Sequence, residues 1–110
     1  MTVAQIHVVD FVGIDPSGRA VLTISDHLSW DDIKSHLFTL QEKLNAYLRF
    51  IESGEMTEKQ PDLAGRAILI AVVLKFPIPN KADWFFVKTS AAIEAAGFSF
   101  EARTLEGRLN

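Results

Sequence analysis

The pattern of hydrophobic and polar residues changes its period along the chain, and each change predicts a new element of secondary structure. Val and Ile recur within Ile6–Ile14 and Arg19–Ser25, which predicts two strands. Between them, Asp15-Pro16-Ser17-Gly18 matches a type I turn, with Asp first, Pro second and Gly fourth. Because Gly18 can adopt a positive φ angle and form a bulge, we expect these two strands to form an antiparallel hairpin.

A long amphipathic helix is predicted after the hairpin. Ser29 is expected to cap its start, with Asp32 closing a capping box, and Gly54 suits a left-handed cap at its end. These signals predict a helix of about 24 residues, roughly 36 Å long. Its apolar stripe has the spacing of one helix face. The stripe consists of Ile33, Leu37, Leu40, Leu44, Leu48 and Ile51.

The second half of the chain contains a continuous apolar run and an alternating one. Glu55–Gly65 is polar and predicts a loop. Arg66–Phe76 is apolar on both faces, as in a central strand that is covered on both sides. From Phe98 to Arg103, apolar and polar residues alternate, which predicts a last strand that is half buried.

A second helix is expected between these two strands. It runs from a cap at Asn80 to Ala96, and Gly97 ends it. Trp84–Val87 could instead begin as strand. With the helix, the element order is ββαβαβ. This order predicts a two-layer α+β fold, in which one long and one shorter helix cover a mostly antiparallel four-stranded sheet.

Length and composition limit the classes of function. A chain of 110 residues is expected to form a single domain, with residues 106–110 as a tail. The net charge is −3 and Lys and Arg form no cluster, so we expect no binding to nucleic acid. The absence of Cys excludes disulfides and thiolate catalysis. The longest apolar run, Ala67–Leu74, is far shorter than the ~20 residues of a membrane helix, and a signal peptide is not evident. We expect a cytoplasmic protein without a cofactor or a membrane partner.

Titratable side chains gather around the start of the long helix. In the predicted hairpin register Asp10 faces Ile24, and Asp26 lies diagonally across from Asp10 at about 7 Å. Two carboxylates on an apolar face could share a proton or hold a metal ion. Asp32 and His36 are one helical turn apart and face the same way. The candidates for a small metal-dependent or acid–base hydrolase are Asp10, Asp26, His27, Asp32 and His36.

A structural interpretation of the same residues is favoured. Asp31 and Asp32 lie where carboxylates complement the helix dipole, and Asp26 ends a strand. His36 lies at the border of the apolar stripe, where a partly buried imidazole is ordinary. We therefore assign no catalytic residue and no metal ligand. The remaining polar residues of the long helix, Glu42, Lys43 and Tyr47, are expected to form a solvated flank.

The chain has more large hydrophobic side chains than two helices and one sheet can easily cover. Phe38 and Phe50 lie off the apolar stripe, and the residues Trp84, Phe85 and Phe86 point in three directions around a helix. Exposed apolar patches of this kind usually serve association, most commonly in a two-fold dimer.

The run SDHLSWDD…HLFTLQEKLNAYLRFIESGE resembles a family of small bacterial proteins of unknown function, and the resemblance covers Val8 to about Phe76. It implies a bacterial single-domain protein, and it transfers no activity, ligand or catalytic residue. We favour a non-catalytic interaction or accessory module that forms a homodimer or binds another protein. Besides the hydrolase, a small-molecule binder with an aromatic pocket wall at Trp84–Phe86 stays open. The predicted binding surface consists of Phe38, Gln41, Asn45, Arg49, Trp84 and Phe86.

Overall fold

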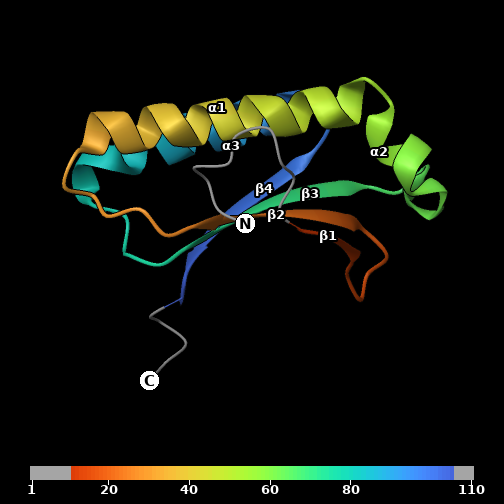
Figure 1. The fold of residues 1–110 in the computed structure, drawn as a ribbon, viewed down its shortest axis with the longest axis horizontal. Coiled ribbons are helices and arrows are strands. Elements are labelled where there is room, and N and C mark those ends of the chain that lie inside the picture. Colours follow the sequence, from red (N-terminus) through yellow and green to blue (C-terminus); the bar gives the residue numbers. More distant parts are fainter. Residues whose placement is uncertain (1–10, 106–110) are drawn as a thin grey trace.

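The computed structural model describes residues 11–105 and confirms the predicted α+β fold and the order of its main elements (Figure 1). Three short helical turns are added to the predicted set. Both long helices lie on one face of the sheet, which gives two layers. The strands are β1 (Phe11–Ile14), β2 (Ala20–Asp26), β3 (Ile68–Leu74) and β4 (Ser99–Thr104). The helices are α1 (Ile33–Glu52), α2 (Glu55–Lys59) and α3 (Asp83–Ala95), with 3-10 turns η1 (Pro61–Leu63) and η2 (Asn80–Ala82).

The strand directions differ from the prediction of a mostly antiparallel sheet. The strands follow one another in space in the order β1-β2-β3-β4, and only β1 and β2 are antiparallel. The pairs β2–β3 and β3–β4 are both parallel. The reason is that α1 and α3 each carry the chain back to the end of the sheet at which the preceding strand began, so the next strand runs in the same direction. The tight hairpin between β1 and β2 instead reverses the direction of the chain. The sheet is therefore mixed.

The hairpin between β1 and β2 has the predicted register. Val12 lies opposite Leu22 and Ile14 opposite Ala20, and Gly18 has a φ angle of 91°. The backbone N–H of Gly18 donates to the carbonyl of Asp15 at 2.9 Å, which closes the turn. The predicted pairing of Asp10 lies outside the described residues.

The N-terminal cap of α1 lies three residues later than predicted. Asp32, and not Ser29, is the cap, because the Asp32 carboxylate accepts the backbone N–H of Ser35 at 3.1 Å. The hydroxyl of Ser29 donates instead to the carboxylate of Asp31. The predicted end of the helix is confirmed, since Gly54 has a left-handed φ angle of 86°. Residues 27–32 are thus left as a connection between β2 and α1.

The predicted loop over residues 55–65 is in fact the helical turns α2 and η1. They carry Met56 and Leu63, which are almost fully buried in the core. Neither η2 nor α3 begins with a side-chain cap, so the predicted cap at Asn80 is wrong, and Trp84–Val87 is helical. Gly97 ends the helix as predicted, with a φ angle of 93°, and the end of α3 is a Schellman motif, in which the backbone N–H of Phe98 donates to the Ile93 carbonyl at 3.1 Å.

The core lies between the sheet and the two long helices. On α1 the buried face is wider than the predicted stripe, because Lys43 and Tyr47 are fully buried together with Leu40. The expected solvated position of these two polar residues is therefore wrong. The hydroxyl of Tyr47 donates to the carbonyl of Thr23 in β2 at 2.9 Å, and the Lys43 ammonium lies 5.5 Å from the centre of the Tyr47 ring. No helix among residues 11–105 is long and apolar enough to cross a bilayer.

Candidate functional site

Asp26 and His36 form a buried pair between the end of β2 and the first turns of α1. The Nε2 atom of His36 lies 2.5 Å from Oδ2 of Asp26, and their side chains are 2% and 0% exposed. At this distance one proton must lie between the two atoms, whichever of them formally carries it. The parallel pairing of β2 with β3 ends at Asp26, so the pair joins α1 to the end of the central strands.

Every other polar atom of the pair also has a partner. The Nδ1 atom of His36 lies 3.0 Å from the carbonyl oxygen of Ser29, which can only accept, so Nδ1 must donate. The second oxygen of Asp26 accepts the backbone N–H of Leu28 at 3.0 Å. The Trp30 ring is stacked on the imidazole, with 3.7 Å between ring centroids. No buried side-chain nitrogen or oxygen is left without a partner among the described residues.

This arrangement limits the chemistry of His36. A histidine base must reach the proton that it abstracts, and a histidine ligand needs a free nitrogen lone pair for the metal. Both ring nitrogens are already engaged, and Trp30 covers one face of the ring. In the described structure, the pair is therefore a buried hydrogen bond that links the end of β2 to α1.

The structure does not bring the other predicted hydrolase residues to this pair. His27 is exposed, and Asp32 is occupied as the cap of α1. Within the described part of the chain, no three His, Cys, Asp or Glu side chains form a group that could hold a metal ion. Asp10 lies outside residues 11–105. The hydrolase interpretation stays a prediction, and among its described candidates only Asp26 and His36 meet.

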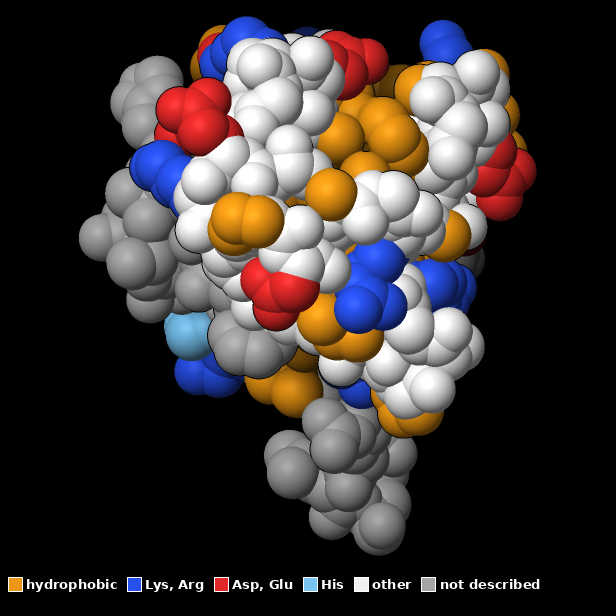
Figure 2. Space-filling model, turned by 90° about the vertical axis from the view of Figure 1, so that its right-hand side faces the viewer, with side chains coloured by type: hydrophobic (Ala, Val, Ile, Leu, Met, Phe, Trp, Pro, Cys, Tyr) orange, Lys and Arg blue, Asp and Glu red, His pale blue; other side chains and the backbone are white. Residues whose placement is uncertain are grey.

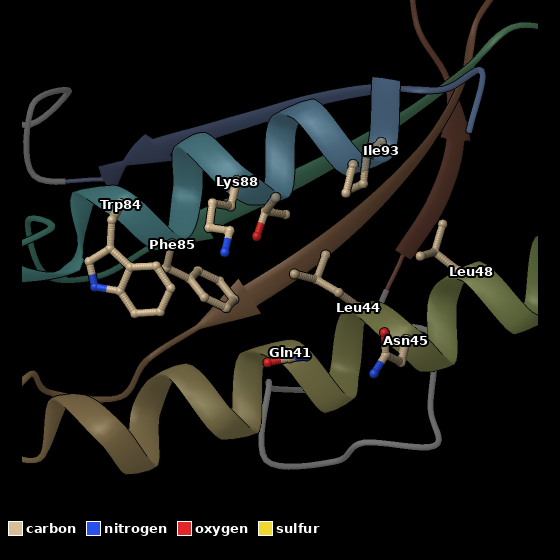
Figure 3. Close-up of a pocket in the computed structure, with 10 residues that line it drawn as sticks. Gln41, Leu44, Asn45, Leu48, Trp84, Phe85, Lys88 and Ile93 are labelled. Atoms are coloured by element: carbon tan, nitrogen blue, oxygen red, sulfur yellow. The ribbon is translucent and has the colours of Figure 1, made fainter. Parts of the chain in front are cut away.

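A groove of about 310 Å³ separates α1 from α3 (Figure 3). Its buried floor is apolar, and Phe85 and Leu44 point toward each other across it. Figure 2 shows hydrophobic side chains gathered in a hollow in the upper part of the molecule, where the helix layer lies. The groove is lined by Gln41, Leu44, Asn45 and Leu48 of α1 and by Trp84, Phe85, Lys88, Thr89, Ala92 and Ile93 of α3.

Three residues of the predicted binding surface, Gln41, Asn45 and Trp84, line this groove. Phe38 is 65% exposed and lies one helical turn before Gln41 on the same side of α1. Arg49 is exposed, one turn beyond Asn45. These positions surround one hollow, although they come from two separate helices.

Phe86 differs from the rest of the predicted surface, because it is only 9% exposed. It packs into the core, where it makes edge contacts with Phe85 and Trp30 at ring distances of 5.4 and 6.3 Å. Phe85 and Lys88 line the groove but were not part of the binding surface predicted from the sequence. Their spacing of three residues places both on one side of α3, and that spacing could have indicated them.

A second hollow of about 600 Å³ runs along the other side of α3, next to β4. Val87 on this side is 70% exposed, and Ala91 one turn further is also exposed. The hollow is lined by Asp83, Phe86, Val87, Ser90, Ala91 and Glu94 of α3 and by Phe100, Glu101 and Ala102 of β4.

The fold, the buried Asp26–His36 pair and the two hollows define a small α+β protein with apolar side chains partly exposed along its helices. The chain belongs to the family of unknown function DUF6572, whose model matches residues 1–106. This agrees with the resemblance to a family without an assigned activity. Comparisons with curated proteins and with solved structures gave no match.

Proposed function

We propose that this protein is a non-catalytic interaction module that binds an apolar segment of a partner protein in the groove between α1 and α3. The observation that carries the proposal is an open groove with a buried apolar floor, lined in part by the exposed aromatic ring of Trp84. Large apolar side chains gathered on a surface are typical of interaction sites, and Trp is enriched among residues that dominate binding energy.

The residues that line the groove indicate the chemistry of the partner. Two roughly parallel walls that are themselves helices suit an amphipathic helix, whose apolar face would lie on Leu44, Leu48 and Ile93. The amides of Gln41 and Asn45 can hydrogen-bond polar groups at the edge of that helix. Lys88 is the charged residue that lines the groove, so the bound helix is expected to carry an acidic residue beside it.

The buried Asp–His pair supports a role without catalysis, since both nitrogens of His36 are engaged within the protein. The proposal also includes a homodimeric state, a bacterial origin and work in the cytoplasm, which are expectations from the sequence. Its partners are proteins, with no role for nucleic acid.

The proposal can be tested with a displayed library of amphipathic helical peptides of about 16 residues, four turns long. Peptides selected on the wild-type protein are expected to carry an acidic residue. Trp84→Ala and Asn45→Arg should each weaken their binding at least about tenfold in calorimetry, the size of effect that a central interface residue produces. Lys88→Glu should select peptides with a basic residue instead.

A matched control is Phe76→Ala, which removes another exposed aromatic ring outside the groove. This variant should bind the selected peptides as the wild type does. Backbone amide shifts of labelled protein should change along the facing sides of α1 and α3 when peptide is added. Peptides that perturb a different surface, or that bind the Trp84→Ala variant unchanged, would refute the groove as the binding site.

A small apolar ligand is the second candidate for the same groove. The volume of about 310 Å³ lies at the lower end of the range of small-molecule pockets, roughly 300–1,000 Å³. Titration with a library of apolar fragments, followed by tryptophan fluorescence, tests this alternative. A fragment that binds at micromolar concentration, changes the fluorescence of the wild type but not of Trp84→Phe, and displaces the peptides would favour it.

A further inference from the structure

The outer side of β4 is one of the two edges of the sheet. β4 is the last strand in the order β1-β2-β3-β4, and among residues 11–105 no other strand pairs with its outer side. Unpaired edges readily take up another strand, and soluble proteins protect them with Pro, bulges or charged side chains. The β4 sequence, SFEART, contains no Pro, and its two charged residues have opposite signs.

We propose that a second copy of this chain pairs with this edge, so that two β4 strands run antiparallel about a two-fold axis at Ala102. This strand pairing would be the interface of the homodimer included in the proposed function, and it is independent of the groove between α1 and α3. The two sheets would then form one continuous sheet of eight strands, twice the four of one chain, with all helices on the same face.

The charges of β4 are complementary to themselves in this arrangement. Phe100 and Ala102 pack against the core, so Glu101 and Arg103, which alternate with them, point to the other face of the sheet. Both are about half exposed, and they are only loosely paired, at 3.9 Å. When Ala102 lies opposite the partner's Ala102, Glu101 lies opposite the partner's Arg103, and Arg103 lies opposite the partner's Glu101. Opposite charges that face each other across antiparallel strands stabilise the pairing.

The same charges specify the register. If the two strands slip so that the two-fold axis lies at Glu101, Glu101 faces the partner's Glu101. If the axis lies at Arg103, Arg103 faces the partner's Arg103. Like charges directly opposite one another are destabilising. A register shifted by an odd number of residues would put the helix-facing side chains of one strand on the same face as Glu101 and Arg103 of the other.

The helix layer supplies a second part of the interface. α3 packs against β4, so the partner's α3 would lie beside it across the two-fold axis. Packed helices have their axes roughly 8–10 Å apart, so the two helices must sit back from the axis by about half of that distance. Val87 and Ala91, which are exposed along the hollow beside β4, would then be covered by the partner's α3.

Sedimentation equilibrium tests the proposal with charge reversals at two exposed positions. The wild type should sediment at twice the chain mass of 12.2 kDa. Glu101→Arg and Arg103→Glu should each raise the dimer dissociation constant about tenfold or more, because each places two like-charged pairs at the interface. An equal mixture of the two variants should form a heterodimer, since every facing pair then has opposite charges.

Three controls keep the outcomes distinct. Lys59→Glu disrupts the exposed ion pair with Glu55 on α2 and should leave the dimer intact. Circular dichroism should show that the β4 variants are folded. Arg103→Glu should still bind the peptides selected on the groove, and Trp84→Ala should still dimerise, so failure of one proposal is separable from failure of the other.

Cross-linking tests the register directly, because the chain contains no cysteine. Facing Cα atoms in antiparallel strands are about 4.5–5.5 Å apart, within the span of a disulfide. Ala102→Cys should therefore give an oxidised dimer, whereas Ser99→Cys should not, since position 99 faces position 105 of the partner. A monomeric wild type, a dimer that both charge reversals leave unchanged, or equal cross-linking at both positions would overturn the proposal.

Discussion

The Asp26–His36 pair and the groove between α1 and α3 show opposite relations between residue type and surroundings. The pair consists of ionisable groups that are buried and have all their hydrogen bonds within the protein. The groove consists of apolar groups that are partly exposed and lack a covering element among residues 11–105. A buried group whose bonds are complete serves stability, and an apolar surface left open serves association. The sequence suggested a possible hydrolase site around Asp26 and His36, whereas in the fold both side chains are buried and bonded within the protein.

The largest expected effect comes from breaking the buried pair. His36→Ala leaves the Asp26 carboxylate buried without its partner, which should lower the free energy of unfolding by roughly 3–5 kcal/mol. Asp26→Asn should cost far less, about 1 kcal/mol, because the new amide can donate to Nε2 of a neutral imidazole while Nδ1 still donates to Ser29. Urea unfolding of both variants measures the difference.

A double variant serves as the control for the buried pair. Asp26→Leu with His36→Leu replaces both partners by apolar side chains, so it should be more stable than His36→Ala, as is often found for buried ion pairs. If His36→Ala were as stable as the wild type, the pair would not be a structural link, and a functional role for His36 would have to be considered again.

A smaller effect is expected at Tyr47, another polar residue on the buried side of α1. Tyr47→Phe removes the hydroxyl that donates to the Thr23 carbonyl and should lower the free energy of unfolding by about 1 kcal/mol. Binding of the groove peptides should be unchanged, because Tyr47 does not line the groove. A loss of peptide binding with no loss of stability would show that Tyr47 serves binding rather than folding.

Local signals in the sequence predicted those parts of the fold that depend on a few neighbouring residues. The Asp15–Gly18 turn determined the hairpin register, and Gly54 and Gly97 determined where the two long helices end. Strand direction was not predicted, because it depends on how α1 and α3 carry the chain over the sheet. The start of α1 was missed because Ser29 and Asp32 are both common cap residues, and the Ser29 hydroxyl bonds the Asp31 carboxylate while Asp32 caps the helix.

The candidate site was predicted less well than the fold, for a physical reason. Whether a polar residue is exposed depends on which side of a helix the sheet covers, and hydrophobicity alone placed Lys43 and Tyr47 on the wrong side. In the same way, Trp84 and Phe86 were predicted to belong to one binding surface. The fold divides them, since Trp84 is exposed at the groove while Phe86 lies in the core.

Trp84 should show only a small effect on stability in spite of its size. It is 56% exposed and makes one edge contact with the Phe85 ring, at 6.0 Å between centroids, so Trp84→Ala should lower the free energy of unfolding by about 1 kcal/mol or less. Thermal unfolding beside the peptide titration measures both quantities on one variant. A strong loss of stability would mean that Trp84 belongs to the core rather than to a binding surface.

The turn at Asp15 provides a surface counterpart to the buried pair, and its effect depends on pH. Desolvation would raise the pKa of the Asp15 carboxyl, but hydrogen bonds from the Arg19 backbone, the Arg19 guanidinium and Ser17, with the charge of Arg19, lower it to about 2 from 3.8. The folded state therefore binds this proton less readily than the unfolded chain does. The resulting stabilisation is complete above about pH 4 and is lost as the pH falls through about 2.

Asp15→Asn should consequently be less stable than the wild type at pH 7, and the difference should disappear as the pH approaches 2. Urea midpoints recorded at intervals between pH 7 and pH 2 measure this loss, which is a small effect because the ion pair lies at the surface, where Arg19 is 39% exposed and solvent screens the charges. Arg19→Gln keeps the backbone donor but removes the guanidinium, so it should reduce the pH-dependent part only partially. A difference between Asp15→Asn and the wild type that stayed constant down to pH 2 would show that the turn is held by its shape, through Gly18, rather than by the carboxylate charge.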